Sequence, residues 1–171
     1  NGNGLITVQG SVSSSDGGLG GSTVTATITV NPMADTPSIT NATTNEDEMS
    51  ISGLVISRNG VDGDEVTHFK ITSITNGSLY KNNGSTSITN NDFITFAEGN
   101  AGLKFDPDPN FNGNGFITIQ ASISSSNGGL GGNTVTATIT VNTIADTPSI
   151  TNATTNEDEM SISDLIISRN A

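Results

Sequence analysis

The sequence has no cysteine, no tryptophan and only five basic residues among 171. Without cysteine, neither a disulfide framework nor a thiolate metal site is available. Five bases against 17 acids give a net charge of −12, which disfavours binding to nucleic acid because lysine and arginine hold the phosphate backbone. No apolar run approaches the roughly 20 residues that cross a bilayer. We therefore expect neither a nucleic-acid partner nor membrane insertion.

A repeat of domain size organises the chain. Residues 1–60 align without gaps on residues 112–171 and differ at 11 positions, so 49 of 60 are identical. An offset of 111 residues corresponds to a whole domain and is too long for a solenoid coil. The linkers "NPMADTPSI" and "NTIADTPSI" contain a proline that stops central strand pairing. We expect the C-terminal part of one repeat in 1–34, a complete repeat in 35–145 (the central repeat) and the N-terminal part of the next in 146–171.

Short strand patterns separated by glycine and asparagine fill the central repeat. The stretch "TVTATITV" at 134–141 alternates apolar residues with threonine, as a strand with one buried and one solvated face does. Such segments predict an all-β fold, a Greek-key seven-stranded β-sandwich, with strands at 37–40, 49–57, 66–75, 78–82, 102–106, 116–123 and 134–141. The expected core consists of Ile51, Leu54, Ile56, Phe69, Ile71, Leu103, Phe105, Ile117, Ile119, Val135, Ile139 and Val141.

Most acidic residues of the central repeat lie in the linkers and in loops that strand parity places at two ends. If seven strands alternate in direction, the loop "NEDE" lies at one end with the loop "FDPDPNFNG" and the outgoing linker. The loop "NGVDGDEV" lies at the other end, beside the incoming linker. Each junction between repeats would then gather carboxylates that resist ionisation beside one another. The simpler alternative is that these loops are solvated surface.

A divalent cation with oxygen ligands would relieve this repulsion. Ca²⁺ accepts 6–8 oxygens in irregular geometry, whereas Mg²⁺ demands a stricter octahedron. Transition metals are disfavoured by the lack of cysteine and by the single His68. The sequence therefore predicts calcium as the cofactor, with candidate ligands at Asp35, Glu46, Asp47, Glu48, Asp62, Asp64, Asp106, Asp108, Asp146, Glu157 and Glu159.

The pattern of these acids resembles the ligand plan of cadherins, with an aspartate before the linker proline and a D-x-D loop. More closely, the stretches "ADTPSITNATTNEDE", "NGVDGDEVTHFKITSITNGSLY" and "DFITFAEGNAGLKFDPDPNFNGNGFITI" resemble the bacterial cadherin-like tandem repeats of giant secreted (RTX-type) surface adhesins. The resemblance covers nearly all of the repeat. It implies an extracellular array of cadherin-like or Ig-like sandwiches, stiffened by calcium and secreted or attached to a bacterial cell surface. The linker "NTIAD" has fewer acids than the animal family, which implies one or two ions per junction.

These features favour a structural spacer over an enzyme or a binding module. The serines lie in Gly/Ser turns with no histidine nearby in sequence, so no catalytic residue is expected. Carbohydrate binding remains an alternative, although Tyr80 is the only tyrosine that could stack on a sugar. A self-assembling extracellular filament is the strongest alternative, because unpaired strands of part-domains can pair with neighbours. The expected partners are neighbouring repeats of the same chain or fibre, with cell-surface or matrix ligands bound through other parts of the protein.

Overall fold

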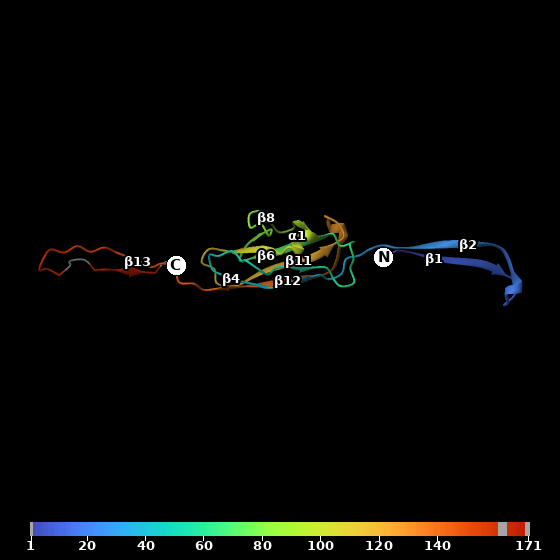
Figure 1. Cartoon of the computed structure of the whole chain (residues 1–171), viewed down its shortest axis with the longest axis horizontal. Coiled ribbons are helices and arrows are strands. Elements are labelled where there is room, and N and C mark those ends of the chain that lie inside the picture. The colour runs from blue at the N-terminus through green and yellow to red at the C-terminus, as the bar shows by residue number, and fades with distance from the viewer. Residues whose placement is uncertain (1, 161–163, 170–171) are drawn as a thin grey trace.

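The computed structural model describes residues 2–160 and 164–169, and its regular secondary structure consists almost entirely of β-strands. The all-β prediction is therefore confirmed. Three parts follow one another along the long axis: an N-terminal hairpin, the central repeat, and a C-terminal segment that extends from the opposite end (Figure 1). Among the described residues, no helix is long and apolar enough to span a bilayer.

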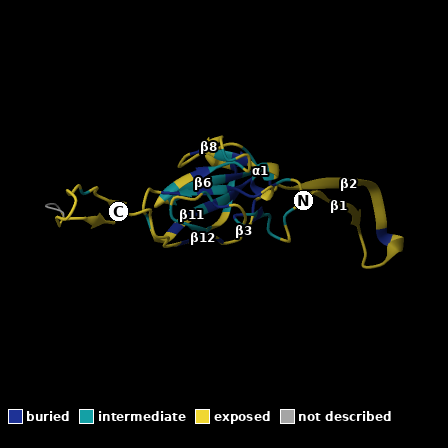
Figure 2. Cartoon of the chain, turned by 60° about the vertical axis from the view of Figure 1, so that its left-hand side comes forward, coloured by how far each residue is buried: buried dark blue, intermediate teal, exposed yellow. Residues whose placement is uncertain are grey.

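The N-terminal hairpin pairs β1 (Gly2–Ser11) with β2 (Leu19–Val30) through the short 3₁₀ turn Asp16–Gly18. Its strands are antiparallel, from Gly2 opposite Val30 to Ser11 opposite Leu19. Apart from Gly18, every residue from Gly2 to Val30 is exposed, as Figure 2 shows in yellow. This hairpin thus has strand pairing without a core.

A five-stranded sheet forms one side of the central repeat, in the order β4 (Ala42–Asn45), β12 (Leu130–Asn142), β11 (Gly113–Ser122), β6 (His68–Thr75) and β9 (Phe93–Thr95). The pair β4 and β12 is parallel, with Ala42 beside Ile139 and Asn45 beside Asn142, and the other pairs are antiparallel. The long strands β11 and β12 follow the predicted alternation of Val, Ile and Thr, which exposes one face and buries the other.

The remaining strands form two smaller sheets. One contains β10 (Lys104–Pro107), β7 (Gly77–Tyr80) and β8 (Ser87–Ile88), and the other pairs β3 (Ser38–Ile39) with β5 (Ile56–Ser57). A short helix α1 (Phe96–Asn100) precedes β10, and a 3₁₀ turn at Asn127–Gly129 joins β11 to β12. All these elements contribute to one core, whose largest fully buried residues are Phe69, Phe105, Leu54, Ile56, Ile71, Leu79, Ile94, Leu103, Ile117, Ile119, Ile139 and Val66.

The predicted strand at 49–57 is wrong over most of its length, because only Ile56–Ser57 pairs as a strand. Gly53 and Leu54 have φ angles of +92° and +53°, and such left-handed conformations interrupt an extended strand. The interruption leaves Ile51 85% exposed, so this residue does not belong to the core as expected. Val135 is also only partly buried.

Three short strands were not predicted: β4, which lies outside the expected initial strand at 37–40, and β8 and β9. The central repeat, all of whose residues are described, therefore has ten strands where seven were expected. Because the two additional strands between 82 and 102 are an even number, the direction of β10 is unchanged. Its C-terminal residue Pro107 lies opposite Gly77, and Asp108 donates its N–H to the carbonyl of Asn76. The loop after β10 thus lies at the end predicted by parity.

The C-terminal segment pairs β13 (Ser149–Ile150) with β14 (Ile167–Ser168). These strands are the counterparts of β3 and β5, which pair in the same register within the central repeat. Every described residue of this segment is exposed except the partly buried Ala153. Like the N-terminal hairpin, this segment repeats a local structure of the central repeat without its core.

Candidate metal site at the repeat junctions

The incoming linker, residues 31–37, contacts the acidic loop at the N-terminal end of the central repeat. Both carboxylate oxygens of Asp62 accept the backbone N–H of Asp35, at 3.2 Å each. Asp64 instead forms an ion pair with Arg58, whose Nη1 lies 2.8 Å from Oδ1. The structure therefore brings the backbone of Asp35 and the carboxylate of Asp62 together, while the carboxylate of Asp64 is paired with the guanidinium of Arg58.

Arg58 is itself held firmly by the central repeat. Its Nε donates to the carbonyl of Val66 at 2.7 Å, and its guanidinium lies 3.8 Å from the centre of the Phe96 ring. This side chain is largely shielded, whereas Asp64 is fully exposed. Solvent screens such an exposed pair, so Asp64 remains free to exchange its partner.

At the C-terminal end, the acidic turn after β4 binds the outgoing linker and the loop after β10. The Oε1 atom of Glu46 accepts the N–H of Ile144 at 2.6 Å. Asp47, with φ of +59°, accepts the N–H of Asn110 through Oδ1 at 3.0 Å. The backbone of Glu46 also donates to the carbonyl of Asn142. Single acids of this turn thus connect three segments that are far apart in sequence.

The other predicted ligands at this end lie further apart. Glu48 accepts a hydrogen bond from the amide of Asn45 at 2.9 Å, and Glu159 repeats this contact with Asn156 in the C-terminal segment. Asp106 lies within β10 opposite Ser78, and Asp108 is exposed in the loop that follows. Glu157 and Glu159 belong to the exposed turn between β13 and β14.

A surface depression lies where the central repeat meets the outgoing linker. Glu46 and Asp146, both predicted ligands, line it, and Asn110 and Asn112 add amide oxygens. Its remaining lining consists of Ile144, Ala145 and Arg169. The two asparagines were not predicted as site residues, although the stretch "FDPDPNFNGN" that contains them was singled out for its acids. Arg169, the counterpart of Arg58, was also missed and brings a positive charge to the depression.

The oxygen donors near the outgoing linker are of the type that Ca²⁺ binds, but too few of them lie together to fill its coordination shell. Carboxylate and amide oxygens are the ligands that Ca²⁺ prefers, and it takes 6–8 of them. Among the residues that the structure describes, no three Asp, Glu or His side chains lie close enough together to hold a metal ion. The predicted ligands divide between the two ends of the central repeat, and at the C-terminal end Glu46, Asp47 and Glu48 each bind a different partner. The second copy of the repeated stretch stops before the counterparts of Asp62 and Asp64, so neither junction carries both sets.

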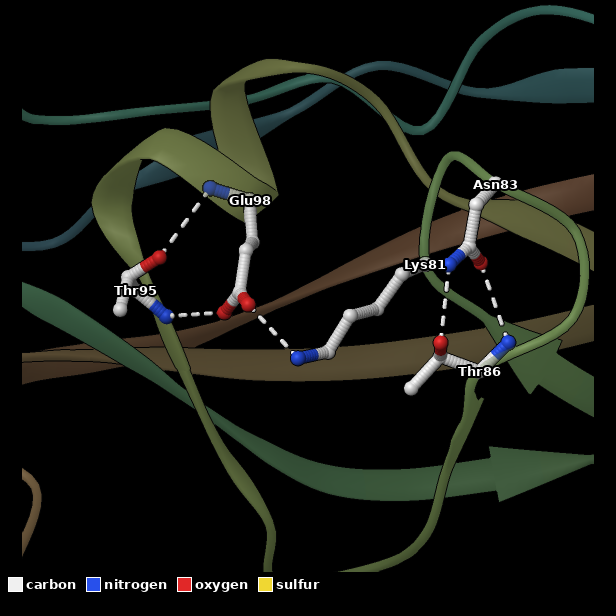
Figure 3. Close-up of polar contacts among 5 residues, drawn as sticks. All are labelled: Lys81, Asn83, Thr86, Thr95 and Glu98. Carbon is white, nitrogen blue, oxygen red and sulfur yellow. Dashed lines mark hydrogen bonds and ion pairs between the residues drawn. The ribbon is translucent and has the colours of Figure 1, made fainter.

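The carboxylate of Glu98 forms an ion pair with Lys81 and caps the start of α1. Its Oε1 atom lies 2.6 Å from Nζ of Lys81, and its Oε2 atom accepts the N–H of Thr95 at 2.8 Å (Figure 3). The hydroxyl of Thr95 accepts the N–H of Glu98 in return, which completes a capping box at the start of α1. The hydrogen bond from Lys81, followed by that from Thr95, lowers the pKa of Glu98. This carboxylate stabilises the helix and binds a loop rather than a ligand.

Comparisons with models of protein families, with curated proteins and with solved structures gave no match.

Proposed function

We propose that this chain is part of a calcium-stiffened spacer in an extracellular tandem-repeat adhesin or surface fibre of a bacterium. In this proposal each complete repeat is a cadherin-like Greek-key β-sandwich, and the function of the array is to hold other parts of the protein at a distance. The chain itself performs no catalysis, and its immediate partners are the neighbouring repeats.

The observation that carries the proposal is that acidic side chains hold the linker at both ends of the central repeat. Asp62 binds the backbone of Asp35 at the incoming linker, and Glu46 binds the backbone of Ile144 at the outgoing linker. A junction between two complete repeats would therefore place Glu46 and Asp146 of one repeat beside the counterpart of Asp62 in the next. The combined set is rich in oxygen donors and comes from three segments that must move relative to one another when the junction bends.

When bound there, calcium would supply the positive charge that these carboxylates lack. The residues that would hold it are Glu46, Asp146, Asn110 and Asn112, together with the D-x-D acids of the following repeat. Without a cation, like charges repel and the short linker permits bending. Each sandwich would add roughly 40 Å to the array, since its long strands have about eleven residues at 3.4 Å each.

The proposal is tested with a longer chain that contains at least two complete copies of residues 35–145. Extracellular modules bind calcium with a Kd of about 10⁻⁴–10⁻³ M, and tenfold excess over Kd then stabilises each site by about 1.4 kcal/mol. We expect a heat of binding in calorimetric titration, a higher Tm, and small-angle scattering that changes from a long rod with calcium to a shorter, flexible chain after chelation.

Substitutions at the junction test whether these acidic residues cause the calcium response. Glu46→Gln together with Asp146→Asn should abolish the calcium response while the repeats stay folded, because both changes preserve shape and remove charge. Asp16→Asn is a matched control: it also removes one carboxylate, lies at the hairpin tip, and introduces the residue found at the counterpart position Asn127. The absence of a calcium heat, together with identical scattering in calcium and in chelator, would mean that the acids are solvated surface.

A further inference from the structure

The second half of the incoming linker, residues 34–37 (the docked segment), is packed on the central repeat. Ala34 is only 2% exposed, and Pro37 is buried as well. Two glycines near the start of β12 make room for this backbone. A Cβ on Gly131 would overlap the carbonyl oxygen of Ala34, and a Cβ on Gly132 would overlap the linker backbone further along. The start of β12 thus has the shape that the linker requires.

Hydrogen bonds from two elements also hold the docked segment. The hydroxyl of Thr36 accepts the N–H of Asn133 in β12 at 2.9 Å. The carbonyl of Thr36 accepts the side-chain amide of Asn59 at 3.0 Å. The N–H of Asp35 donates to the carboxylate of Asp62. Because Asn59 and Asp62 lie in the loop between β5 and β6, the linker is held between this loop and β12.

The first half of the linker, residues 31–33 (the linker hinge), lacks such contacts. All three residues are exposed, and none of them forms a hydrogen bond with another described residue. At the outgoing end, the counterpart of Met33 is Ile144, whose N–H is held only by the side chain of Glu46. The incoming linker therefore changes from unsupported to docked at one peptide bond, between Met33 and Ala34.

We propose that the docked segment is a fixed part of the repeat that it enters, so that bending between repeats is confined to the linker hinge. The docking contacts join the linker to the central repeat alone and involve no cation, so we expect them to persist without calcium. A hinge of three residues spans at most about 10 Å, which keeps successive repeats close together in every orientation.

This arrangement has a consequence for a tandem array. A short hinge would keep the acidic groups of two successive repeats within reach of one cation before the cation binds. Less chain would then have to be ordered when the junction stiffens, and ordering the backbone costs about 1–2 kcal/mol for each residue. The consequence rests on the proposed function, whereas the docking itself does not.

Backbone ¹⁵N relaxation of the full chain, measured in chelator, tests the proposal. A rigid backbone has an order parameter of about 0.85, and a flexible one lies below about 0.6. We expect rigid values for Ala34, Asp35 and Thr36 and clearly lower values for Asn31 and Met33. Low values that continue through Thr36 would refute the docking, and rigid values from Asn31 onwards would refute the hinge.

Two substitutions should release the docked segment. Gly131→Ala places a methyl group against the carbonyl of Ala34, so the order parameters of residues 34–36 should fall to those of the hinge. Thr36→Val preserves the shape of the side chain and removes the acceptor for the N–H of Asn133. This amide should then exchange with solvent about fivefold faster, as expected for the loss of one hydrogen bond.

Each variant has a matched control. Gly128→Ala adds a methyl group that would meet only the hydroxyl oxygen of Ser126, at 3.9 Å. Thr134→Val makes the same exchange as Thr36→Val at an exposed position of β12. Both controls should keep the relaxation and exchange profiles of the natural chain. If Gly131→Ala does not fold, Thr36→Val alone decides, and unchanged exchange of Asn133 in that variant would overturn the proposal.

A longer chain with two complete repeats separates this proposal from the proposed role of calcium. Gly131→Ala in both repeats should shorten the particle seen by small-angle scattering in calcium and in chelator alike. Glu46→Gln with Asp146→Asn should change only the response to calcium. If no calcium binds, the relaxation profile in chelator still decides the docking. If residues 34–36 prove mobile while calcium still lengthens the array, the hinge proposal fails and the proposed function stands.

Discussion

Hairpin β1–β2 and hairpin β11–β12 agree in their local details. Thr7 contacts Thr25 as Thr118 contacts Thr136, with oxygen atoms 3.0 and 2.8 Å apart. Both hairpins change register at the same place, one residue before the counterparts Gly10 and Ala121, and both close through a three-residue 3₁₀ turn. This agreement shows that the turn, the bulge and the strand pairing follow from about thirty local residues.

Burial separates the two hairpins completely. The central hairpin is covered by β4 on one edge, by β6 on the other and by the smaller sheets on its apolar face, while the N-terminal hairpin has none of these neighbours among the described residues. The difference shows that the alternation of Val, Ile and Thr specifies which face can be buried, and that other segments decide whether it is buried. Matched substitutions in the two hairpins measure this contribution directly.

The largest difference is expected for removal of the same isoleucine side chain. Ile139→Ala should lower the free energy of unfolding by about 2–5 kcal/mol, because it leaves a cavity in a closed core. Ile28→Ala should lower it by less than about 1 kcal/mol, since Ile28 is half exposed. Urea unfolding of dilute, monomeric protein provides both values, and equal losses would contradict the contrast in packing.

A smaller effect is expected for glycines at matched positions. A Cβ on Gly115 would lie 2.6 Å from Cζ of Phe105, whereas a Cβ on Gly4 would make an ordinary contact of 3.6 Å with Ile28. Gly115→Ala should therefore cost about 1–3 kcal/mol through overpacking. Gly4→Ala should change the stability by no more than about 0.5 kcal/mol. A Gly115→Ala variant with the Tm of the natural chain would show that Phe105 can move away freely.

The smallest effect concerns pH and involves only the central repeat. The pKa of Glu98 is lowered in the folded state, so its contribution is present above the unfolded pKa of about 4.3 and is lost as pH falls through the lower folded value. Since this side chain is about one-third exposed, Glu98→Gln should cost only about 0.5–1 kcal/mol at pH 7. The difference from the natural chain should shrink towards pH 3. Urea unfolding at pH 7 and pH 3 measures the loss of stability caused by Glu98→Gln, with Asp16→Asn in the N-terminal hairpin as a control. An equal loss at both pH values would contradict the lowered pKa of Glu98.

Several elements could be predicted because their signal is local. Strand β11 covers all but the last residue of the predicted segment 116–123 and begins three residues before it, and β12 covers 134–141 and extends beyond it at both ends, since period-two alternation persists along each. The segment around Gly53 and Leu54 could not be predicted, because a leucine with positive φ leaves no mark in the sequence. Its conformation is imposed by neighbours, among them Leu103, whose N–H donates to the Leu54 carbonyl.

The sequence predicted where the acidic residues of the candidate site lie, but it did not predict the partner that each carboxylate binds. Strand parity placed Glu46 near the outgoing linker, and the two unpredicted strands β8 and β9 leave the parity of the strands after Glu46 unchanged. The prediction also placed Asp62 near the incoming linker, where it binds Asp35. The partners of each carboxylate depend on backbone N–H groups and on arginines whose position is set by packing, as Arg58 shows with Asp64. Whether calcium replaces these partners remains a prediction.

The parallel pairing of β4 with β12 has a mechanical consequence. The incoming chain forms the short β3 and then β4, and the outgoing chain leaves just after β12, which is the direct neighbour of β4. Tension along the long axis pulls β4 back towards its N-terminus and β12 forward towards its C-terminus. The four residue pairs from Ala42–Ile139 to Asn45–Asn142 are then loaded in shear, so their hydrogen bonds must break together rather than one after another. Resistance to forced unfolding is set by the unfolding rate, and this geometry places a barrier to extension between β4 and β12, near the two ends of the repeat.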